Sequence, residues 1–501
     1  MDSFLENYFK TQKKSLQTSA GISFWAACDA INEDHPEVAS HIVQELQDQR
    51  RFLKLIASEN FASLKTQLAM GNLLTDKYAE GVPAHRFYAG CDNVDAIEHK
   101  AIASLKELFG AEHAFVQPHS GADANIIAFW AILLKKVQSK EIERLGKKNL
   151  DELTPCEYEH TRKLLVNQKL LGMSLNSGGH LTHGYRHNIS SKMMHSAFYD
   201  VDPETQILDY DIIRKRAQQE KPTILLAGYS AYPRLVNFAK MREIADEVGA
   251  TLLVDMAHFA GLVAGKVCTG EYDPIPYAEV VTSTTHKTLR GPRGGIVLCT
   301  NEYKEYVNKG CPLAMGGPLP HVIAAKSVAF DEALRPSFST YAQKVVENAK
   351  ALAESLMEKG VKLITNGTDN HMVIIDVSPF GITGRQAELS LRKANITCNR
   401  NAIPFDKNGP WYTSGIRIGT PALTTLGMGK EEMKRIGSII YTCLSETKPT
   451  HTRDGALSKA QSSLDKKVAD KLEKEVEEML GAFPLYPELG NIYTNKSSIC
   501  L

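Results

Sequence analysis

The sequence predicts an α/β protein: a large domain on a mostly parallel central sheet, followed by a smaller α+β domain. Two observations carry this prediction. Between residues 223 and 299, short apolar segments alternate with amphipathic helical segments, which is typical of a parallel sheet covered on both faces. After about residue 320, a long helical stretch is followed by separate strand patterns.

The length of 501 residues exceeds what one ordinary hydrophobic core supports. We therefore expect three parts: an N-terminal helical arm (1–70), a large domain (71–325) and a small C-terminal domain (326–501). Residues of about 135–170 are charged and amphipathic, which predicts a helical insertion on the surface of the large domain.

The elements of the large domain follow from the period of its apolar residues. The segment 239–250 has helical spacing and meets a stop signal at Gly249. The flanking apolar runs are too short for helices and predict strands. These strands are 223–230, 251–258, 279–284 and 294–299.

The C-terminal part has a different pattern. We expect a long helical stretch over 321–359, strands over 371–377 and 414–422, and a helix over 385–396. The polar segment 448–478 shows helical spacing from about residue 456, which predicts a helix facing solvent.

Composition limits the partners and the compartment. Lys plus Arg and Asp plus Glu each total 58, so the formal charge is zero, which argues against nucleic acid or an anionic membrane as the main partner. The nine cysteines are scattered singly, which predicts reduced thiols, no metal site and a cytoplasmic protein. The acidic start predicts no secretory signal, and no run approaches the roughly 20 apolar residues of a membrane helix.

Polar side chains lie at the ends of three of the predicted strands. Ser230 ends the first, Asp255 and His258 lie in the last part of the second, and His286 and Lys287 follow the third. Ligands of open α/β sheets bind at the carboxyl ends of the strands, so these residues are expected to meet in one crevice.

Lys287 indicates the chemistry of that crevice. A lysine is rarely buried without a partner, but a desolvated amine suits a Schiff base with a carbonyl cofactor such as pyridoxal phosphate. Asp255 suits the protonated ring nitrogen, the turn at Ser120 and Gly121 suits the phosphate, and Arg417 suits a carboxylate. Each residue taken alone also has a plain structural explanation: an ion pair, a turn or a helix cap.

The chain resembles the serine hydroxymethyltransferases. The motifs that carry the resemblance are long, and they occur in order over about residues 50–440. They are "LIASEN" (55–60), "DKYAEG" (76–81), "SGGHLTHG" (177–184), "VDMAHFAGLVAG" (254–265), "VVTSTTHKTLRGPRGG" (280–295) and "TSGIRIGTPA" (413–422). The resemblance implies the fold-type I pyridoxal phosphate architecture, similar to aspartate aminotransferase. It also implies a homodimer or a dimer of dimers, with active sites built from two subunits.

The resemblance further implies individual roles. Lys287 matches the Schiff-base lysine, Asp255 the partner of the pyridinium nitrogen, and His180 the histidine that stacks on the ring. Glu80 and Tyr88 match the catalytic glutamate and tyrosine, contributed across the subunit interface. The cofactor positions are completed by Ser58, Tyr78, Ser120, Gly121, Ala122, Ser230, His258, His286 and Gly316, with Tyr78 and Gly316 expected from the neighbouring subunit. Positions for the amino acid and for folate are Ser58, Glu80, Arg417, Leu175, Gly179, Leu181 and Asn401.

The implied reaction moves the hydroxymethyl carbon of serine to tetrahydrofolate, leaving glycine and methylenetetrahydrofolate. Two alternatives remain open from the sequence. One is a folate-independent aldolase or racemase that acts on small amino acids with the same cofactor, either instead of the transfer or as a side activity. The other is a catalytically silent binding protein on the same scaffold, although Lys287, Asp255 and Arg417 are all retained.

Overall fold

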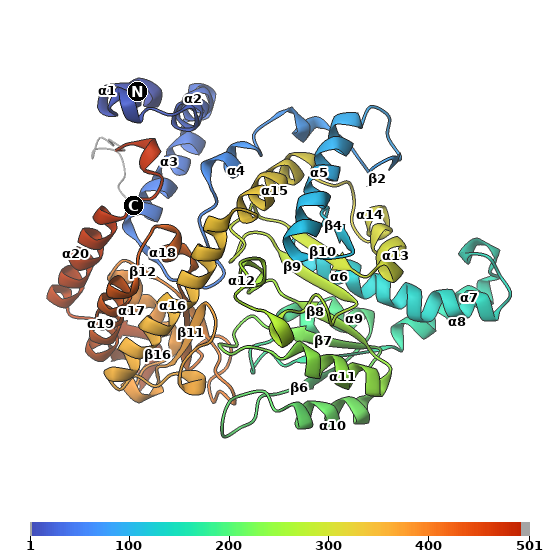
Figure 1. Cartoon of the computed structure of the whole chain (residues 1–501). Helices are drawn as coiled ribbons and strands as arrows, with labels where there is room; N and C mark the ends of the chain where they lie inside the picture. Colours follow the sequence, from blue (N-terminus) through green and yellow to red (C-terminus); the bar gives the residue numbers. More distant parts are fainter. Residues whose placement is uncertain (1–2, 492–501) are drawn as a thin grey trace.

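The computed structural model describes residues 3–491 and contains a seven-stranded central sheet (Figure 1). Its strand order is β4-β10-β9-β8-β7-β5-β6, and only β10 runs antiparallel to its neighbours. The mostly parallel sheet is therefore confirmed. The strands are β4 (His113–Phe115), β5 (Lys169–Met173), β6 (His195–Tyr199), β7 (Ile224–Gly228), β8 (Thr251–Asp255), β9 (Val280–Thr284) and β10 (Gly295–Cys299).

Both faces of this sheet are buried, because neighbouring residues of a strand point to opposite sides. Leu225 and Leu252 enter one hydrophobic core, whereas Leu226 and Leu253 enter the other. The first core also receives α5 (Asp92–Phe109), α10 (Tyr210–Glu220), α11 (Phe238–Val248), α12 (Ala260–Ala264) and α15 (Pro320–Ala333). The second receives α6 (Gly121–Leu133) and α13 (Lys304–Asn308).

The small domain is built on a three-stranded antiparallel sheet. Its strands are β11 (Met372–Asp376), β14 (Gly415–Gly419) and β13 (Asn399–Asn401), in that order. The helices packed around it are α16 (Pro336–Glu358), α17 (Gly384–Lys393), α18 (Pro421–Thr425) and α19 (Lys430–Glu446). The helical stretch predicted over 321–359 is two helices, α15 and α16. Arg335 is extended between them because the following proline disfavours a helical conformation.

The prediction of a single helix from residue 456 is wrong. Residues 448–463 form an antiparallel hairpin of β15 (Lys448–His451) and β16 (Leu457–Ser463), and the helix α20 (Lys466–Ala482) begins only afterwards. The hairpin is fixed by α17, since Nε2 of Gln386 donates to the carbonyls of Ser458 and Gln461. α20 also does not simply face solvent: Leu472 and Val476 enter the core of the small domain.

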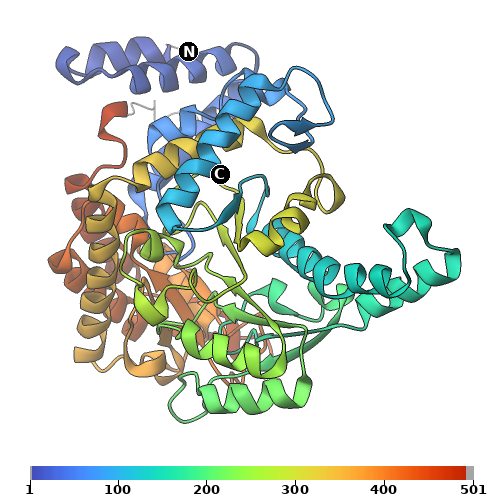
Figure 2. The same cartoon turned by 45° about the vertical axis from the view of Figure 1, so that its right-hand side comes forward.

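The predicted insertion forms an arm that projects from the body in two views (Figures 1 and 2). A π-helical turn (Leu134–Gln138) continues α6 into α7 (Ser139–Arg144), and α8 (Pro155–Val166) leads back to the sheet. The tip between α7 and α8 contains a single 3-10 turn, Leu150–Glu152.

The N-terminal arm is helical and contacts the C-terminal segment. Its helices are α1 (Phe4–Thr11), α2 (Ser19–Asp34), α3 (Pro36–Arg51) and α4 (Leu64–Leu68). Trp25 packs in a core that includes Leu485 and Leu489. After α3, β1 (Leu53–Lys54) pairs in parallel with β12 (Ile396–Thr397) of the small domain. The N-terminal arm is therefore joined to the distant C-terminal part by this strand pair.

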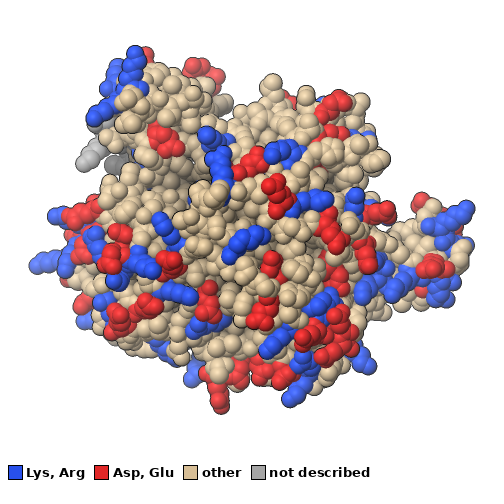
Figure 3. Space-filling model, viewed as in Figure 1, with Lys and Arg blue, Asp and Glu red and all other residues tan. Residues whose placement is uncertain are grey.

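The surface in Figure 3 shows lysines and arginines interspersed with aspartates and glutamates. Within residues 3–491, no helix is both long and apolar enough to cross a bilayer. The eight cysteines in this range form no disulfide, and Cys500 lies outside the described residues.

Candidate active site

Lys287 lies just beyond the carboxyl end of β9, and its side chain is 9% exposed. The side chain of Asn60 donates to the Lys287 carbonyl at 2.9 Å, which ties the loop to the segment after β1. Burial lowers the pKa of Lys287 to about 8. The negative charge of Asp255 opposes this shift, whereas the positive charges of Arg417 and Arg293 add to it. The amine is therefore far easier to deprotonate than an ordinary lysine.

Asp255 ends β8 and is a fully paired buried carboxylate. One oxygen accepts from the backbone N–H of Ala257 at 3.0 Å. The other accepts from Asn125 at 2.9 Å and meets Nε2 of His183 at 3.1 Å. Burial alone would raise the pKa of Asp255, but the hydrogen bond and charge of His183 hold it well below its usual range. A permanent negative charge thus lies within the crevice.

His180 opens the 3-10 turn Leu181–His183, and its Nδ1 lies 2.8 Å from the hydroxyl of Thr182. Burial, and then the neighbouring His183, lower the pKa of His180 to about 4, so the imidazole is neutral at physiological pH. Ligand atoms of His180, His183 and Asp255 all lie within 4.8 Å of one another, a set that could also hold a metal ion.

Arg417 is in the middle of β14, and its guanidinium spans the two domains. Nη1 donates to Ser230 at its carbonyl (2.5 Å) and hydroxyl (3.1 Å), and Nη2 donates to Asn399 at 3.1 Å. Nε is buried without a partner among the described residues. One N–H of a buried arginine is therefore left for an anion such as a carboxylate.

A pair of buried histidines lies behind Ser230. Nε2 of His258 is 3.4 Å from the Ser230 hydroxyl, and its Nδ1 is 3.3 Å from Nε2 of His371. Burial comes first among the causes that lower the pKa of both, that of His371 to about 3. Both imidazoles are neutral, and His258 can therefore accept or donate a hydrogen bond.

The predicted phosphate turn is the N-terminus of α6. The Ser120 hydroxyl caps the helix by accepting from the N–H of Asp123 at 3.2 Å. A Cβ on Gly121 would lie 2.6 Å from Cγ2 of Thr284, so only glycine fits there. Ala122 is half-buried in the first turn, and Nδ1 of His286 is buried without a partner in the described chain. These groups form an N–H-rich turn suited to phosphate.

The hydroxyls that precede Lys287 donate to groups of the protein and are not free donors for a ligand. Thr282 donates to Asn125, Ser283 to a backbone carbonyl, and Thr284 to the carbonyl of Ala257. Thr285 donates to the carbonyl of Pro292. They stabilise the strand and loop because each one is buried and needs a protein acceptor.

Tyr78, Glu80 and Tyr88 form a separate group around the hairpin of β2 (Gly81–Val82) and β3 (His85–Arg86). The rings of Tyr78 and Tyr88 are 4.8 Å apart, and the Tyr78 hydroxyl is 3.4 Å from Glu80. Both tyrosines are exposed, as is Gly316. No hydrogen bond, ion pair or ring contact among the described residues joins this group to Lys287, Asp255 or Arg417.

The predicted folate positions lie on segments next to the crevice. Gly179 is buried against the backbone of Met173, whereas Leu181 is exposed and Leu175 is half-buried. Asn401 is two residues beyond Asn399 on β13 and so shares its face of the strand. Ser58 is half-buried in the segment that contacts β14 through the hydrogen bond from Gly419 to Leu55.

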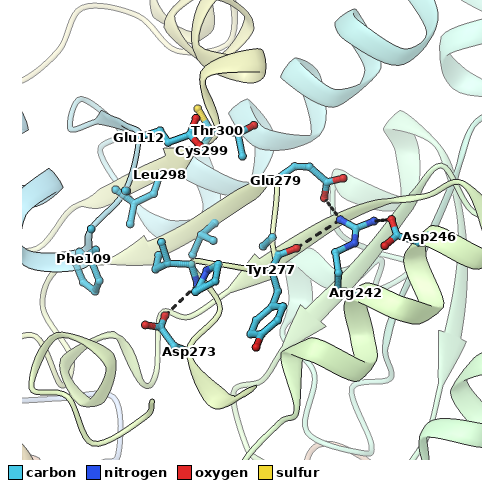
Figure 4. A pocket seen from close by; sticks show the side chains of 16 residues that line it. Phe109, Glu112, Arg242, Asp246, Asp273, Tyr277, Glu279, Leu298, Cys299 and Thr300 are labelled. Atoms are coloured by element: carbon cyan, nitrogen blue, oxygen red, sulfur yellow. Dashed lines mark hydrogen bonds and ion pairs between the residues drawn. The ribbon is translucent and has the colours of Figure 1, made fainter. Parts of the chain in front are cut away.

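A cavity of about 590 Å³ lies elsewhere, at the amino end of β9 (Figure 4). Its arginine, Arg242, already pairs with Glu279 and Asp246. None of the predicted site residues lines it.

Comparison with known proteins decides the family. The family described as serine hydroxymethyltransferase matches residues 31–142 and 159–440. The chain is 55% identical over 488 residues to the serine hydroxymethyltransferase of Treponema pallidum, covering 97% of this chain and 85% of the relative. It is 56% identical over 467 residues to that of Salinispora tropica, covering 93% of this chain and 98% of the relative. The chain belongs to the serine hydroxymethyltransferase family. The fold-type I architecture is thereby confirmed.

Members of the serine hydroxymethyltransferase family interconvert serine and glycine with tetrahydrofolate as co-substrate and pyridoxal phosphate as cofactor, and this is the activity of the chain. When bound, the cofactor supplies an aldehyde for a lysine amine and an electron-withdrawing ring. The residues fit this group: Lys287 is a desolvated amine, Ser120 and Gly121 begin α6 at an N–H-rich turn, and Arg417 and His286 each keep a buried nitrogen without a partner among the described residues.

Sequence reasoning missed the residues that hold Asp255. Asn125 bonds Asp255, Thr182 and Thr282, and His183 bonds Asp255. His183 could have been found, since it stands in the same glycine-flanked motif as His180. Asn125 and His371 gave no signal in the sequence. The contact of Asn125 with Asp255 and that of His371 with His258 each join residues more than a hundred positions apart.

We expect His183→Leu to weaken cofactor binding and to lower the free energy of unfolding by about 1–3 kcal/mol, because a buried carboxylate loses a charge-assisted hydrogen bond. Urea unfolding and cofactor titration would measure the two effects. His187→Leu is the matched control, since His187 is exposed in the same loop. Equal behaviour of the two variants would contradict the assigned contact.

Proposed function

We propose that Lys287, Asp255 and Arg417 form the catalytic centre for the transfer of the serine hydroxymethyl carbon to tetrahydrofolate. The observation that carries this proposal is the convergence of three buried groups: the Lys287 amine after β9, the Asp255 carboxylate at the end of β8, and the Arg417 guanidinium, which reaches from β14 of the small domain to Ser230 after β7. Lys287 holds the cofactor and accepts or returns a proton at Nζ. Asp255 keeps the proton on the ring nitrogen, and Arg417 orients the carboxylate of the amino acid through Nε.

We further propose neighbouring roles around this centre. Ser120, Gly121, Ala122 and His286 face the phosphate, and His258, Ser58 and Ser230 contact the remaining cofactor and substrate groups. His180 stacks on the cofactor ring. Leu175, Gly179, Leu181 and Asn401 contact folate. Support comes from the turn of α6 and from the position of Asn401 beside Asn399, which bonds Arg417.

Glu80, Tyr88, Tyr78 and Gly316 are proposed to act in the crevice of a second copy of the chain, so the active unit is a homodimer or a dimer of dimers. This explains why Tyr78 and Tyr88 lie exposed beside the half-buried Glu80, and why no hydrogen bond, ion pair or ring contact among the described residues joins them to Lys287 of their own chain. A glutamate that becomes partly desolvated at such an interface is suited to proton transfer.

We also propose the division of the chain into three parts (1–70, 71–325 and 326–501) and a cytoplasmic location.

Borohydride reduction tests the proposed attachment. The purified enzyme with pyridoxal phosphate is reduced and digested, and the modified peptide is identified by mass spectrometry. We expect the modification on Lys287 alone, because its amine is buried within the crevice and its pKa is lowered to about 8 by burial. Modification at another lysine, or none, would refute the proposed centre.

Exchange of the glycine α-proton tests the alternative of a folate-independent enzyme. We expect tetrahydrofolate to accelerate this exchange, because glycine and folate occupy one crevice in the proposed arrangement. Proton NMR in deuterated buffer, with and without tetrahydrofolate, gives the two rates. An exchange rate that does not change with folate would contradict the shared crevice, and the rate of alanine racemisation in the same samples measures the proposed side activity.

A further inference from the structure

Lys326 is a second buried lysine, and no role of the proposed centre uses it. It lies in the middle of α15 and is 1% exposed. Its ammonium has carbonyl oxygens as partners: Val116 at 2.6 Å, Pro118 at 3.0 Å and Gly295 at 2.9 Å. An ammonium has three donors, and here each one meets an acceptor. Burying an ammonium costs free energy, so we asked what this lysine does in the fold.

The three carbonyls belong to the two segments that frame the proposed phosphate turn. Val116 and Pro118 lead from β4 to Ser120, the cap of α6. Gly295 begins β10, directly after the loop that carries Lys287. The N–H of Gly295 also donates to the carbonyl of Pro118 at 2.9 Å. The ammonium therefore joins the start of the turn to the end of the lysine loop.

The fit around Lys326 is close. A Cβ on Gly294 would lie 2.5 Å from Cε of Lys326 and 3.0 Å from its Nζ. Lys326 also acts electrostatically on His286. The pKa of His286 is lowered to about 3, chiefly by burial, then by Lys287 and Arg293, and to a smaller extent by Lys326. Burial lowers the pKa of Lys326 to about 7, against the attraction of Glu98 and Asp123.

We propose that Lys326 is a positioning residue for the cofactor phosphate, which holds the turn before Ser120 against the end of the Lys287 loop. The inference rests on the proposed contact of the phosphate with Ser120 and Gly121. Lys326 does not touch the cofactor in this arrangement. It presents the N–H groups of the turn in the orientation that binds phosphate.

The test measures pyridoxal phosphate affinity in Lys326→Met, which keeps the length and apolar volume of the side chain but removes its donors. We expect the Kd for pyridoxal phosphate, followed by absorbance and fluorescence, to rise at least tenfold. The gain in Tm on adding the cofactor to the apo-enzyme should shrink correspondingly, because ligand stabilisation follows the ratio of concentration to Kd. A purely structural role would lower the apo and loaded Tm values equally and leave Kd unchanged.

The control is Lys100→Met, which removes an exposed lysine of α5 that pairs with Asp331 of the same α15 helix. Its Kd should equal that of the wild type. Gly294→Ala is a second variant that keeps Lys326 but displaces its ammonium, so it should also raise the Kd. In the Lys326→Met background the same alanine should add little, since the two changes act on one contact.

The outcomes separate the two proposals. If Ser120→Ala weakens cofactor binding and both Lys326→Met and Gly294→Ala bind normally, the role of Lys326 is refuted while the phosphate turn stands. If Ser120→Ala and Lys326→Met both bind normally, the phosphate lies elsewhere and both proposals fall. If Lys326→Met does not fold, the Kd of Gly294→Ala decides, and a wild-type value refutes the inference.

Discussion

Turnover of serine falls by more than about 10³-fold in Lys287→Met, the upper part of the range for loss of a catalytic acid or base. Methionine fills much of the buried volume but removes the amine that, in the proposed centre, attaches the cofactor and accepts the proton. Steady-state rates with saturating serine and tetrahydrofolate measure the effect. The visible absorbance of the attached cofactor should disappear in the same variant.

Two controls make this result specific. Lys309→Met changes a lysine that stacks on Tyr306 away from the crevice, and it should retain activity. Burial outweighs the attraction of Asp255 in lowering the pKa of Lys287, so replacing the buried amine by methionine should not destabilise the apo-enzyme. Residual turnover above one hundredth of the wild-type rate would contradict the proposed centre.

Mixing two inactive variants restores activity if the active site is shared between copies of the chain. Glu80→Gln alone should lose about 10²–10⁴-fold in turnover, since a general acid–base group is removed. In a dimer formed from Lys287→Met and Glu80→Gln chains, one crevice combines the intact Lys287 of one chain with the intact Glu80 of the other. Random pairing of equal amounts then leaves about one quarter of all sites intact.

The experiment requires coexpression or joint refolding, followed by activity measurement against each variant alone. Recovery to about one quarter of the wild-type rate, many times the rate of either variant, is expected from the symmetry of a dimer. Absence of recovery in confirmed mixed dimers would mean that Glu80 serves its own chain. Sedimentation of the mixture establishes whether dimers are present.

Much of the fold and of the centre was predictable because local sequence carries the relevant physics. The strands β7, β8 and β9 are short apolar runs, and residues at their carboxyl ends meet by the geometry of a parallel sheet. Ser120 and Gly121 indicated the start of α6 through capping chemistry alone. Long ordered motifs supplied the family, and the comparisons confirmed it.

Local pattern failed where tertiary contacts compete with it. The segment 456–463 has helical spacing, but Gln386 of α17 fixes its backbone in a hairpin. The hydroxyls before Lys287 are likewise directed by burial, which requires each of them to bond to the protein.

The sequence by itself determined which chemical groups the chain brings to its crevice and the order in which strands and helices deliver them. Only the tertiary structure decided how those groups are held: Asn125 and His183 on Asp255, His371 behind His258, and the ammonium of Lys326 beneath the phosphate turn. The physical reason is that a strand or a cap depends on neighbours a few residues away. Pairing of buried polar groups depends on partners from distant segments, which only the packed chain places within hydrogen-bonding distance.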